Sequence, residues 1–356
     1  MTVPETMRGM VLTGHGGLDK LEWREDLPIP YPGPGEVLIR VGAAAVNNTD
    51  INTRTGWYSK AVRGDTASGA GGYDGAADAD GSWSGLPLQF PRIQGADCCG
   101  KVVGVGQGVD PGRIGERVLV RPMQAWPGPD GDLVTYTFGS EQDGGFADYA
   151  AARSGDALAI SSDLTDLELA TFPCACSTAE GMIQRVSLGA ERVLITGASG
   201  GVGSAAIQLA KRRGAHVTAL TRAGKEDALL ALGADAALDR DAEFPARDFD
   251  VVLDLVGGPR WEDLIGALKN GGRYVTSGAI AGPIVELDLR TLYLRDLTLL
   301  GSTFQPDHVF ADLVGYIERG EIAPVVAETF ELKDMRAAQD AFLEKKHVGK
   351  IALRVK

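Results

Sequence analysis

The stretch VLITGASGGVGSAAIQLAKRRGAHVTALTRAGK, residues 193–225, contains in succession a strand, a glycine-rich turn, a helix and a second strand. The first strand is a continuous apolar run, which is typical of a parallel strand buried on both faces. Glycines in the turn let backbone N–H groups approach a pyrophosphate at the positive end of the helix. The stretch therefore predicts a dinucleotide-binding unit. Its phosphate contacts are expected from Ser199, Gly200, Gly201, Val202 and Gly203.

The glycine turn matches the usual G-x-G-x-x-G pattern only in part, because Ala198 stands where the first glycine is expected. Its place between a strand and a helix strengthens the dinucleotide interpretation. A tight turn that binds no ligand is the alternative.

The end of the second strand indicates which dinucleotide binds. An acidic residue usually holds the ribose 2′-hydroxyl at this place, but here the strand ends in Thr221 and Arg222, with Lys225 close behind. A carboxylate would repel a 2′-phosphate, whereas Lys and Arg attract one, and Arg can bind it in a bidentate manner. The sequence thus predicts NADPH as the cofactor. The alternative is that both side chains are solvated surface charges.

Length and composition describe a globular protein of two or three domains. The chain has 356 residues, of which 44% are hydrophobic and 23% charged, and its net charge is −13. This acidic balance argues against nucleic acid or an anionic membrane as a partner. The chain has no apolar run of membrane-spanning length, and its first residues lack the apolar segment of a signal peptide. A cytoplasmic location is the expectation.

The pattern of short segments changes near residue 157. Residues 8–155 hold short β-type runs broken by Gly and Pro, which predicts a twisted, barrel-like β domain. From residue 157 strands and helices alternate, which predicts a parallel sheet covered on both faces. The last strands are expected to return to the first domain. Two turn-rich stretches, residues 64–85 and 123–145, are expected to be lids or mobile insertions.

Several stretches along the chain carry a resemblance to a known superfamily. They are GPGEVLIRVGAAAVNNTDINTRTGWY (33–58), IQGADCCGKVVGVG (93–106), GGFADYA (144–150), CSTAEGMI (176–183), GASGGVGSAAIQLAK (197–211) and HVGKIAL (347–353). Together they resemble the medium-chain dehydrogenase/reductase superfamily, and most closely its zinc-free quinone oxidoreductase branch.

The resemblance implies an α/β fold in which a Rossmann doubly wound parallel sheet is inserted in a GroES-like β-barrel catalytic domain. The expected divisions are residues 1–155 and 305–356 for the two parts of the catalytic domain, and 156–304 for the NADP-binding domain. Family members commonly form homodimers by joining the edge strands of their nucleotide sheets. Residues 297–304, LTLLGSTF, would be that edge here.

The resemblance also implies further cofactor contacts. Thr178 would lie at the helix start that meets the cofactor near the nicotinamide. Arg240 falls where the quinone branch often places a tyrosine over the adenine phosphate, so it is a candidate third basic group for a 2′-phosphate. Phe304 and Lys350 fall near positions that contact the cofactor.

Zinc alcohol dehydrogenases of this superfamily bind their catalytic metal through a Cys, a His-Glu pair and a second Cys. The matching places here hold Asn47, Ala96-Asp97 and Cys174, and the four-cysteine structural lobe is absent. Because a catalytic zinc needs about three protein ligands, we expect no metal. The alternative is a rearranged site that combines Asp97, Cys98 or Cys99 with Cys174 or Cys176.

Without a metal, we expect a reaction whose product anion is delocalised over several atoms. Hydride addition to a quinone or a conjugated carbonyl gives a delocalised anion that hydrogen bonds can hold, whereas a plain ketone gives a localised alkoxide. By the resemblance, Asn47, Asp50 and Tyr58 line the pocket beside the nicotinamide. Tyr58 would donate to the substrate oxygen or act as a lid, and Asp50 would have a catalytic role or hold its loop through Arg54.

The leading hypothesis is therefore an NADPH-dependent reductase of quinones or α,β-unsaturated carbonyl compounds, which are small molecules. A second hypothesis is a zinc-dependent alcohol dehydrogenase with unusual ligands. A third, from another class, is a non-enzymatic NADPH-binding protein.

Overall fold

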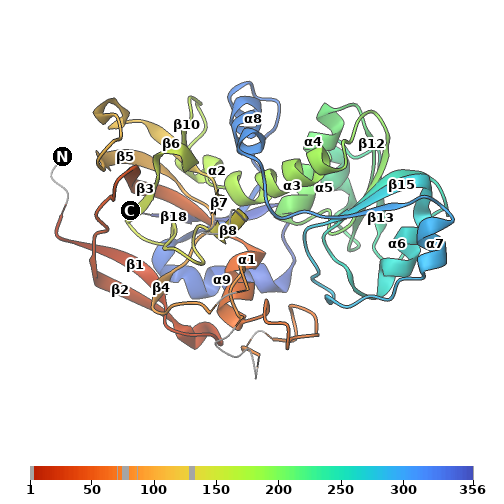
Figure 1. Ribbon diagram of the computed structural model, residues 1–356, viewed down its shortest axis with the longest axis horizontal. Helices are drawn as coiled ribbons and strands as arrows, with labels where there is room; N and C mark the ends of the chain where they lie inside the picture. Colours follow the sequence, from red (N-terminus) through yellow and green to blue (C-terminus); the bar gives the residue numbers. More distant parts are fainter. Residues whose placement is uncertain (1–3, 70, 74–79, 86, 128–132, 356) are drawn as a thin grey trace.

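The structure is a computed structural model of the chain and describes residues 4–69, 71–73, 80–85, 87–127 and 133–355. Figure 1 shows two lobes, one made mostly of antiparallel strands and the other of a parallel sheet with helices around it. Helix α3 (Pro173–Arg185) passes from one lobe to the other.

Antiparallel strands form the first lobe around one apolar core. They are β1 (Thr6–Leu12), β2 (Leu21–Pro28), β3 (Glu36–Val46), β4 (Arg92–Ile93), β5 (Cys99–Val105), β6 (Arg117–Val120), β9 (Tyr149–Arg153), β10 (Ala157–Ala159), β17 (Val326–Glu331) and β18 (Lys350–Arg354). The larger sheet has the order β10-β6-β5-β3-β18-β17, with β9 also paired to β3, and the smaller has the order β2-β1-β4. Val37, Ile39 and Val41 alternate into the core, as the two-residue period of a strand requires.

Strand β18 brings the end of the chain beside β3. Ile351 pairs with Val46 and Arg354 with Ala43 in antiparallel register, while β17 pairs with β18 in parallel. In Figure 1 the blue C-terminal strand accordingly lies next to the red-brown β3. The catalytic domain is therefore built from both ends of the chain, with the nucleotide domain inserted between them, and this confirms the expected fold.

The second lobe is a parallel sheet in the order expected for a dinucleotide-binding fold. Its strands are β11 (Arg192–Ile195), β12 (His216–Thr221), β13 (Ala236–Asp239), β14 (Phe249–Asp254), β15 (Leu268–Thr276) and β16 (Thr298–Gly301). They lie in the order β13-β12-β11-β14-β15-β16, and every neighbouring pair is parallel. The order reverses between β11 and β14, so the ligand crevice lies at the carboxyl ends of these two strands.

Both faces of the parallel sheet are buried, as its near-continuous apolar strands predict. Val193 and Ile195 of β11 belong to one apolar cluster, and Leu194 between them belongs to the cluster on the opposite face. The remaining helices are α1 (Asn48–Thr55), α2 (Asp166–Leu169), α4 (Gly201–Arg212), α5 (Glu226–Ala231), α6 (Trp261–Ala267), α7 (Leu289–Tyr293), α8 (Asp307–Glu318) and α9 (Met335–Glu344). Short 3-10 helices occupy Leu18–Lys20, Pro111–Arg113, Ser154–Asp156, Gly258–Arg260 and Leu332–Asp334.

Two elements, β10 and α8, contact a different domain from the one to which the expected boundaries assign them. Strand β10 follows residue 156 but pairs with β6 of the first lobe. Helix α8 follows residue 305 but packs on α3, and its Phe310 and Leu313 share an apolar cluster with Val193. The three-part division stays a prediction, with these two elements placed on the other side of its boundaries.

The turn-rich stretches contain more structure than expected. Residues 123–145 hold a hairpin of β7 (Met123–Pro127) and β8 (Leu133–Thr137). In residues 64–85, the Thr66 N–H donates to the Ile280 carbonyl at 2.9 Å, so this stretch contacts the nucleotide lobe. Whether the stretch is mobile stays a prediction, and its residues 70 and 74–79 lie outside the described residues.

Strand β16 forms one edge of the parallel sheet, and exposed apolar residues come shortly before it in the chain. Leu289, Tyr293 and Leu294 on and after α7 are 65%, 62% and 67% exposed. This is the edge at which a homodimer contact through residues 297–304 is expected, and that contact stays a prediction.

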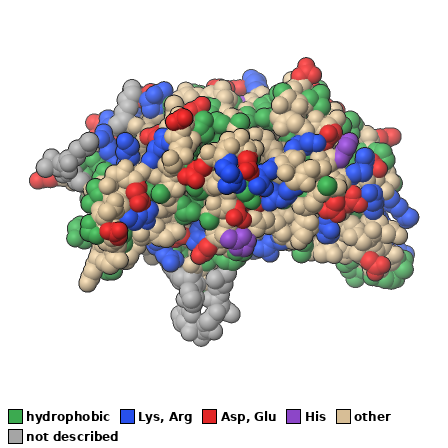
Figure 2. Space-filling view, turned by 90° about the horizontal axis from the view of Figure 1, so that it is seen from above, with side chains coloured by type: hydrophobic (Ala, Val, Ile, Leu, Met, Phe, Trp, Pro, Cys, Tyr) green, Lys and Arg blue, Asp and Glu red, His purple; other side chains and the backbone are tan. Residues whose placement is uncertain are grey.

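Charges are interspersed over the face of the molecule that Figure 2 shows, where acidic, basic and apolar side chains alternate. Of the described helices, none combines the length and the apolar character that crossing a membrane requires.

Candidate active site

The glycine turn joins β11 to α4 at the carboxyl edge of the parallel sheet. Gly197 has a φ of 58°, which favours glycine, and its carbonyl accepts from the Gly200 N–H at 3.0 Å. A Cβ on Gly203 would lie 2.4 Å from the Gly197 oxygen, so only glycine lets α4 pack this closely against the turn. The first turn of a helix presents N–H groups that lack intrahelical acceptors. Ser199 to Val202, at this helix start, are all partly exposed, and the turn therefore fits a phosphate group.

Gly201 is required by a protein contact as well. A Cβ at this position would lie 2.6 Å from Cδ of Lys350, whose side chain passes across the start of α4 and is only 4% exposed. Next to it, the Gly349 N–H donates to the Ser199 carbonyl at 2.9 Å. The C-terminal segment therefore runs directly over the glycine turn.

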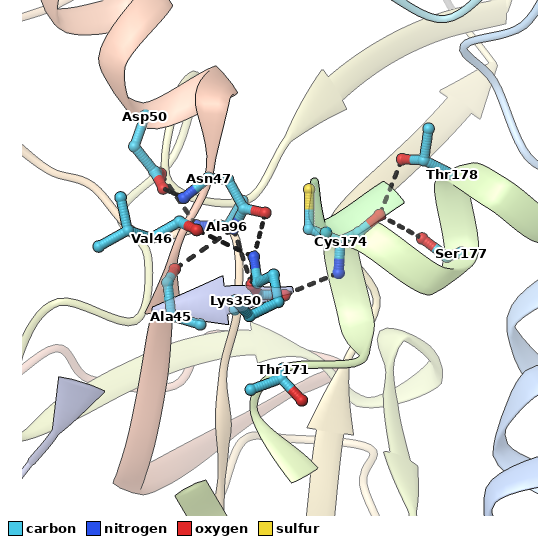
Figure 3. Close-up of polar contacts among 12 residues, drawn as sticks. Ala45, Val46, Asn47, Asp50, Ala96, Thr171, Cys174, Ser177, Thr178 and Lys350 are labelled. Atoms are coloured by element: carbon cyan, nitrogen blue, oxygen red, sulfur yellow. Dashed lines mark hydrogen bonds and ion pairs between the residues drawn. The ribbon is translucent and has the colours of Figure 1, made fainter. Parts of the chain in front are cut away.

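Lys350 ends in a buried polar cluster at the junction of the two lobes (Figure 3). Its Nζ lies 2.8 Å from Asp97 Oδ2, and it donates to the Val46 carbonyl at 3.0 Å and to Asn47 Oδ1. Asp97 is fully buried, and its Oδ1 accepts from the Cys174 N–H at 2.7 Å. These contacts join β3, α3 and β18 through one carboxylate and one ammonium group.

Asn47 and Asp50 are both held by contacts within the protein. Asn47 Nδ2 donates to Asp97 at 2.7 Å and to the Ala45 carbonyl at 3.3 Å, so both amide hydrogens have acceptors. Asp50 caps α1, because its carboxylate accepts from the Asn47 N–H at 2.8 Å and the Ala96 N–H at 3.3 Å. Burial, opposed in part by the Asn47 contact, raises the pKa of Asp50 to about 7. This geometry suits a positioning role for both residues.

Arg54, the partner suggested for Asp50 by the sequence, has other contacts. Its Nε donates to Gln339 at 2.9 Å and another guanidinium nitrogen donates to the Gly16 carbonyl at 2.7 Å. The Asp50 loop is thus held by the backbone of Asn47 and Ala96, as the preceding contacts show, and Gln94 Nε2 adds a hydrogen bond to the Asp50 carbonyl at 2.8 Å.

The places that match zinc ligands do not fit a zinc ion. The Asp97 carboxylate already pairs with an ammonium and accepts from an amide and a backbone N–H. Asn47 and Ala96 stand where the cysteine and the histidine of a zinc site would be, and neither side chain supplies a thiolate or an imidazole. Within the described ranges, no three His, Cys, Asp or Glu side chains come close enough together to bind one metal ion.

Tyr58 follows α1 and reaches the same junction. Its hydroxyl donates to Thr49 Oγ1 at 3.0 Å, and its ring packs edge-on against Trp57. Burial raises the pKa of Tyr58, to which the nearby Cys174 and Asp50 also contribute, so the hydroxyl stays protonated at neutral pH. Tyr58 is therefore a hydrogen-bond donor inside the junction.

Helix α3 presents Cys174 and Thr178 one turn apart. Both are partly exposed, whereas the residues between them are buried, and the Thr178 hydroxyl donates to the Cys174 carbonyl at 2.8 Å. Figure 3 shows Cys174 at the end of α3 beside Asn47 and Lys350, with Thr178 farther along the helix. Phe304, which is expected near a position that contacts the cofactor, is partly buried, and its carbonyl accepts from Arg185 at 3.0 Å.

Of the three basic residues expected near the 2′-phosphate, Arg222 and Lys225 lie near the glycine turn, and the Arg240 side chain is directed elsewhere. Arg222 is exposed at the end of β12, and Lys225 lies with its Nζ 3.5 Å from Ser199 Oγ of the glycine turn. The Arg240 N–H donates to the Thr221 carbonyl, also at the end of β12, but its side chain is exposed and pairs with Asp241 at 3.5 Å. Arg222 and Lys225 thus flank the turn, whereas Arg240 points to a neighbouring carboxylate.

One basic residue of this region was not among the expected site residues. Lys345 ends α9, and its Nζ lies 3.3 Å from Asn48 Oδ1 at the start of α1. Lys225 donates to the Lys345 carbonyl at 2.8 Å, which places the C-terminal segment beside the glycine turn. The basic run KKH at 345–347, whose last residue begins the quoted HVGKIAL, is a signal of this in the sequence.

Family comparisons agree with this two-lobed arrangement. Residues 33–162 match the family described as "Alcohol dehydrogenase GroES-like domain", and residues 201–319 match the family described as "Zinc-binding dehydrogenase".

Relatives cover nearly the whole chain. An "Acryloyl-coenzyme A reductase" from Metallosphaera sedula is 26% identical and is matched over 98% of this chain and 99% of its own length. An "NADPH-dependent alkenal/one oxidoreductase, chloroplastic" from Arabidopsis thaliana is 29% identical over 99% of this chain and 80% of its own. A solved structure from Sinorhizobium meliloti 1021, described provisionally as an alcohol dehydrogenase, is 44% identical with a TM-score of 0.88, over 99% of this chain and 97% of its own.

Proposed function

Since the chain belongs to the medium-chain dehydrogenase/reductase superfamily, we propose that it is an NADPH-dependent reductase of α,β-unsaturated carbonyl compounds or quinones that works without a metal ion. It is an oxidoreductase of this superfamily's kind. The printed activities of the acryloyl-coenzyme A and alkenal/one relatives, which both concern conjugated carbonyl compounds, support this substrate class.

The observation that carries the proposal is the buried Lys350–Asp97 pair among the residues that match zinc ligands. Reduction of an isolated ketone places a full negative charge on one oxygen, which a metal ion can hold as a Lewis acid, whereas the carboxylate of this cluster is already paired with Lys350. A conjugated carbonyl instead spreads the charge over an enolate. Hydrogen bonds, each typically contributing a few kcal/mol in a dry site, suffice to hold that anion.

NADPH supplies a hydride when it is bound. For the rest, the chain's own groups hold and orient the reactants. The Tyr58 hydroxyl is the donor for the substrate oxygen, which would replace Thr49 Oγ1 as its acceptor. Asn47 and Asp50 fix the start of α1, and with it the loop that carries Tyr58. Lys225 and Arg222 hold the phosphate end of the cofactor.

The cofactor preference gives a first prediction. NADPH is expected to bind at least about tenfold more tightly than NADH, which corresponds to about 1.4 kcal/mol. The reason is that Arg222 and Lys225 stand where NADH-binding relatives place a carboxylate. Arg222→Asp is expected to abolish or reverse the preference, and Arg240→Asp serves as the matched control. Fluorescence titrations with both cofactors measure it; equal dissociation constants in the unaltered protein would contradict the prediction.

The site of hydride addition tests the reaction itself. With an enone and NADPH deuterated at both C4 positions of the nicotinamide, the label is expected at the β-carbon of the product. The physical reason is that the Lys350 ammonium is already paired with Asp97, whereas hydrogen bonds can hold the delocalised charge of an enolate. Mass spectrometry and NMR of the product locate the label. Deuterium on the carbinol carbon, with the double bond intact, would show that the reaction class is wrong.

A zinc-dependent alcohol dehydrogenase is the second candidate, because the matched family is described as zinc-binding and the 44% identical structure is described provisionally as an alcohol dehydrogenase. Metal analysis separates the two: less than about 0.2 zinc per chain is expected, since two of three ligands are replaced. Cofactor binding without turnover of any quinone or enone would favour a non-enzymatic NADPH-binding protein.

A further inference from the structure

Basic side chains from two distant parts of the chain meet beside the glycine turn. Lys225 follows β12, and its Nζ donates to the carbonyls of Lys345 and His347 at 2.8 and 2.7 Å. Lys345 has a φ of 53° at the end of α9, and its Nζ lies 3.7 Å from the centroid of the Phe342 ring. The side chain is therefore held over an apolar ring rather than extended into water.

The charged groups that act on the Lys345 amino group are both cations, Arg222 and Lys225. Within the described part of the chain, its Nζ makes a polar contact with the amide oxygen of Asn48. Among the described residues, no Asp or Glu forms an ion pair with Lys345, Lys225 or Arg222. His347 lies in the same field, exposed to the charges of Lys345, Lys225 and Lys350, and its Nδ1 is buried without a partner.

Mutual repulsion makes a cluster of basic groups of this kind resist full protonation. Burial, together with the repulsion of Arg222 and Lys225, lowers the pKa of Lys345 to about 7. Burial and the charges of Lys345, Lys225 and Lys350 lower the pKa of His347 to about 4, so its ring is neutral at neutral pH. An anion placed among these groups would favour the charged form of the lysine.

We propose that dinucleotide binding at this site takes up a proton, which the amino group of Lys345 accepts from water or buffer when the anionic phosphates arrive. The neutral amine becomes an ammonium and no other bond changes. The inference rests on the proposed nucleotide function and adds to it a dependence of cofactor affinity on pH.

The sign and range of the effect follow from linkage. Bound phosphates return the pKa of Lys345 from about 7 toward its ordinary value of about 10.4. Near pH 6 the Lys345 amino group is charged in both the free and the cofactor-bound protein, so it takes up almost no proton on binding. Near pH 8 the free lysine is only about one-tenth charged, so about 0.9 proton is taken up, and the dissociation constant rises up to tenfold per pH unit between about pH 7.5 and 9.5.

Calorimetry of NADPH binding to the full chain at about pH 8 tests the proposal directly. Titrations in buffers of different ionisation enthalpy give the number of protons taken up per cofactor. At this pH the 2′-phosphate, whose second pKa is about 6, stays ionised and adds no uptake of its own. The unaltered protein is expected to take up about 0.5–1 proton.

Variants separate the lysine from other sources of uptake. Lys345→Arg keeps the charge at every pH, so it is expected to bind NADPH with uptake near zero and with an affinity at pH 8 equal to or tighter than that of the unaltered protein. Lys345→Met is expected to bind about tenfold more weakly at pH 6, again without uptake. Lys346→Arg is the control, because Lys346 is exposed and pairs with Glu344, and it should leave uptake unchanged.

Two results would overturn the inference in different ways. Uptake below about 0.2 proton in the unaltered protein, or uptake that persists in Lys345→Arg, would refute the proton coupling while leaving the cofactor proposal intact. Failure of both NADPH and NADH to bind at pH 6 would refute the proposed function, and the coupling with it.

Discussion

The Lys350→Met variant is expected to lose about 3–5 kcal/mol of its free energy of unfolding, because the substitution leaves the Asp97 carboxylate buried without its cation. Asp97 is fully buried and Lys350 is 4% exposed, so water screens neither group. The Asn47 amide and the Val46 carbonyl lose the same donor. Methionine keeps most of the apolar stem that packs against Gly201, so the loss is expected to come from charge and not from volume.

Urea denaturation followed by circular dichroism measures this loss, and a double variant identifies its source. Adding Asp97→Asn to Lys350→Met removes the unpaired charge, and the new amide can still accept from the Cys174 N–H and donate to Asn47 Oδ1. The double variant is therefore expected to recover at least half of the lost stability. Lys346→Met, at an exposed site, should stay within about 0.5 kcal/mol of the unaltered protein. A loss below about 1 kcal/mol in Lys350→Met would mean that the pair is not effectively buried.

The Tyr58→Phe variant is expected to lower kcat/KM roughly ten- to a hundredfold, with most of the loss in kcat. Burial raises the pKa of Tyr58, so the hydroxyl is a reliable donor over the neutral range. A donor of this kind strengthens its hydrogen bond as negative charge develops on the substrate oxygen, and phenylalanine cannot make that bond. The ring stays, and so does its contact with Trp57.

Steady-state kinetics with one enone and one quinone measure the effect. Thr49→Val removes the present acceptor of the Tyr58 hydroxyl and is expected to cause a smaller loss, because the donor itself remains. Tyr31→Phe is a suitable control, since Tyr31 is 90% exposed. A change confined to KM in Tyr58→Phe would identify the residue as a lid, and it would remove the tyrosine from the proposed chemistry.

Local patterns in the sequence predicted the parallel sheet and the β-rich first domain, whereas the insertion of one in the other was implied by the family resemblance. The apolar run before the glycine turn predicts a strand buried on both faces, and Val193, Leu194 and Ile195 are indeed fully buried in two clusters. The alternation of strands and helices fixes a parallel sheet, since each crossover is short and right-handed by preference. Both predictions depend only on residues that are close together in the sequence, and the structure agrees with them for that reason.

The partners of the site residues could not be predicted in this way. Lys350 contacts Asn47 across 303 residues of chain, and nothing local to either residue indicates that the amide is already engaged. Lys345 was missed for the same reason, because its position beside the glycine turn depends on where α9 ends and on the hydrogen bonds from Lys225. Hairpin β7–β8 was missed because its turn-forming residues outweigh its short β-type runs.

The pairing of β3 with β18 has a consequence for how the chain is made. Strand β3 leaves the ribosome about 300 residues before the strand that completes its sheet, since Val46 pairs with Ile351. At synthesis rates of about 5–20 residues per second, this edge waits for roughly 15–60 s. During that interval the apolar residues 43–46 of β3 lack their partners in β18, and their free backbone groups are open to other chains. A chain truncated before β18 (Lys350–Arg354) would leave this part of β3 unpaired, so we expect such chains to aggregate.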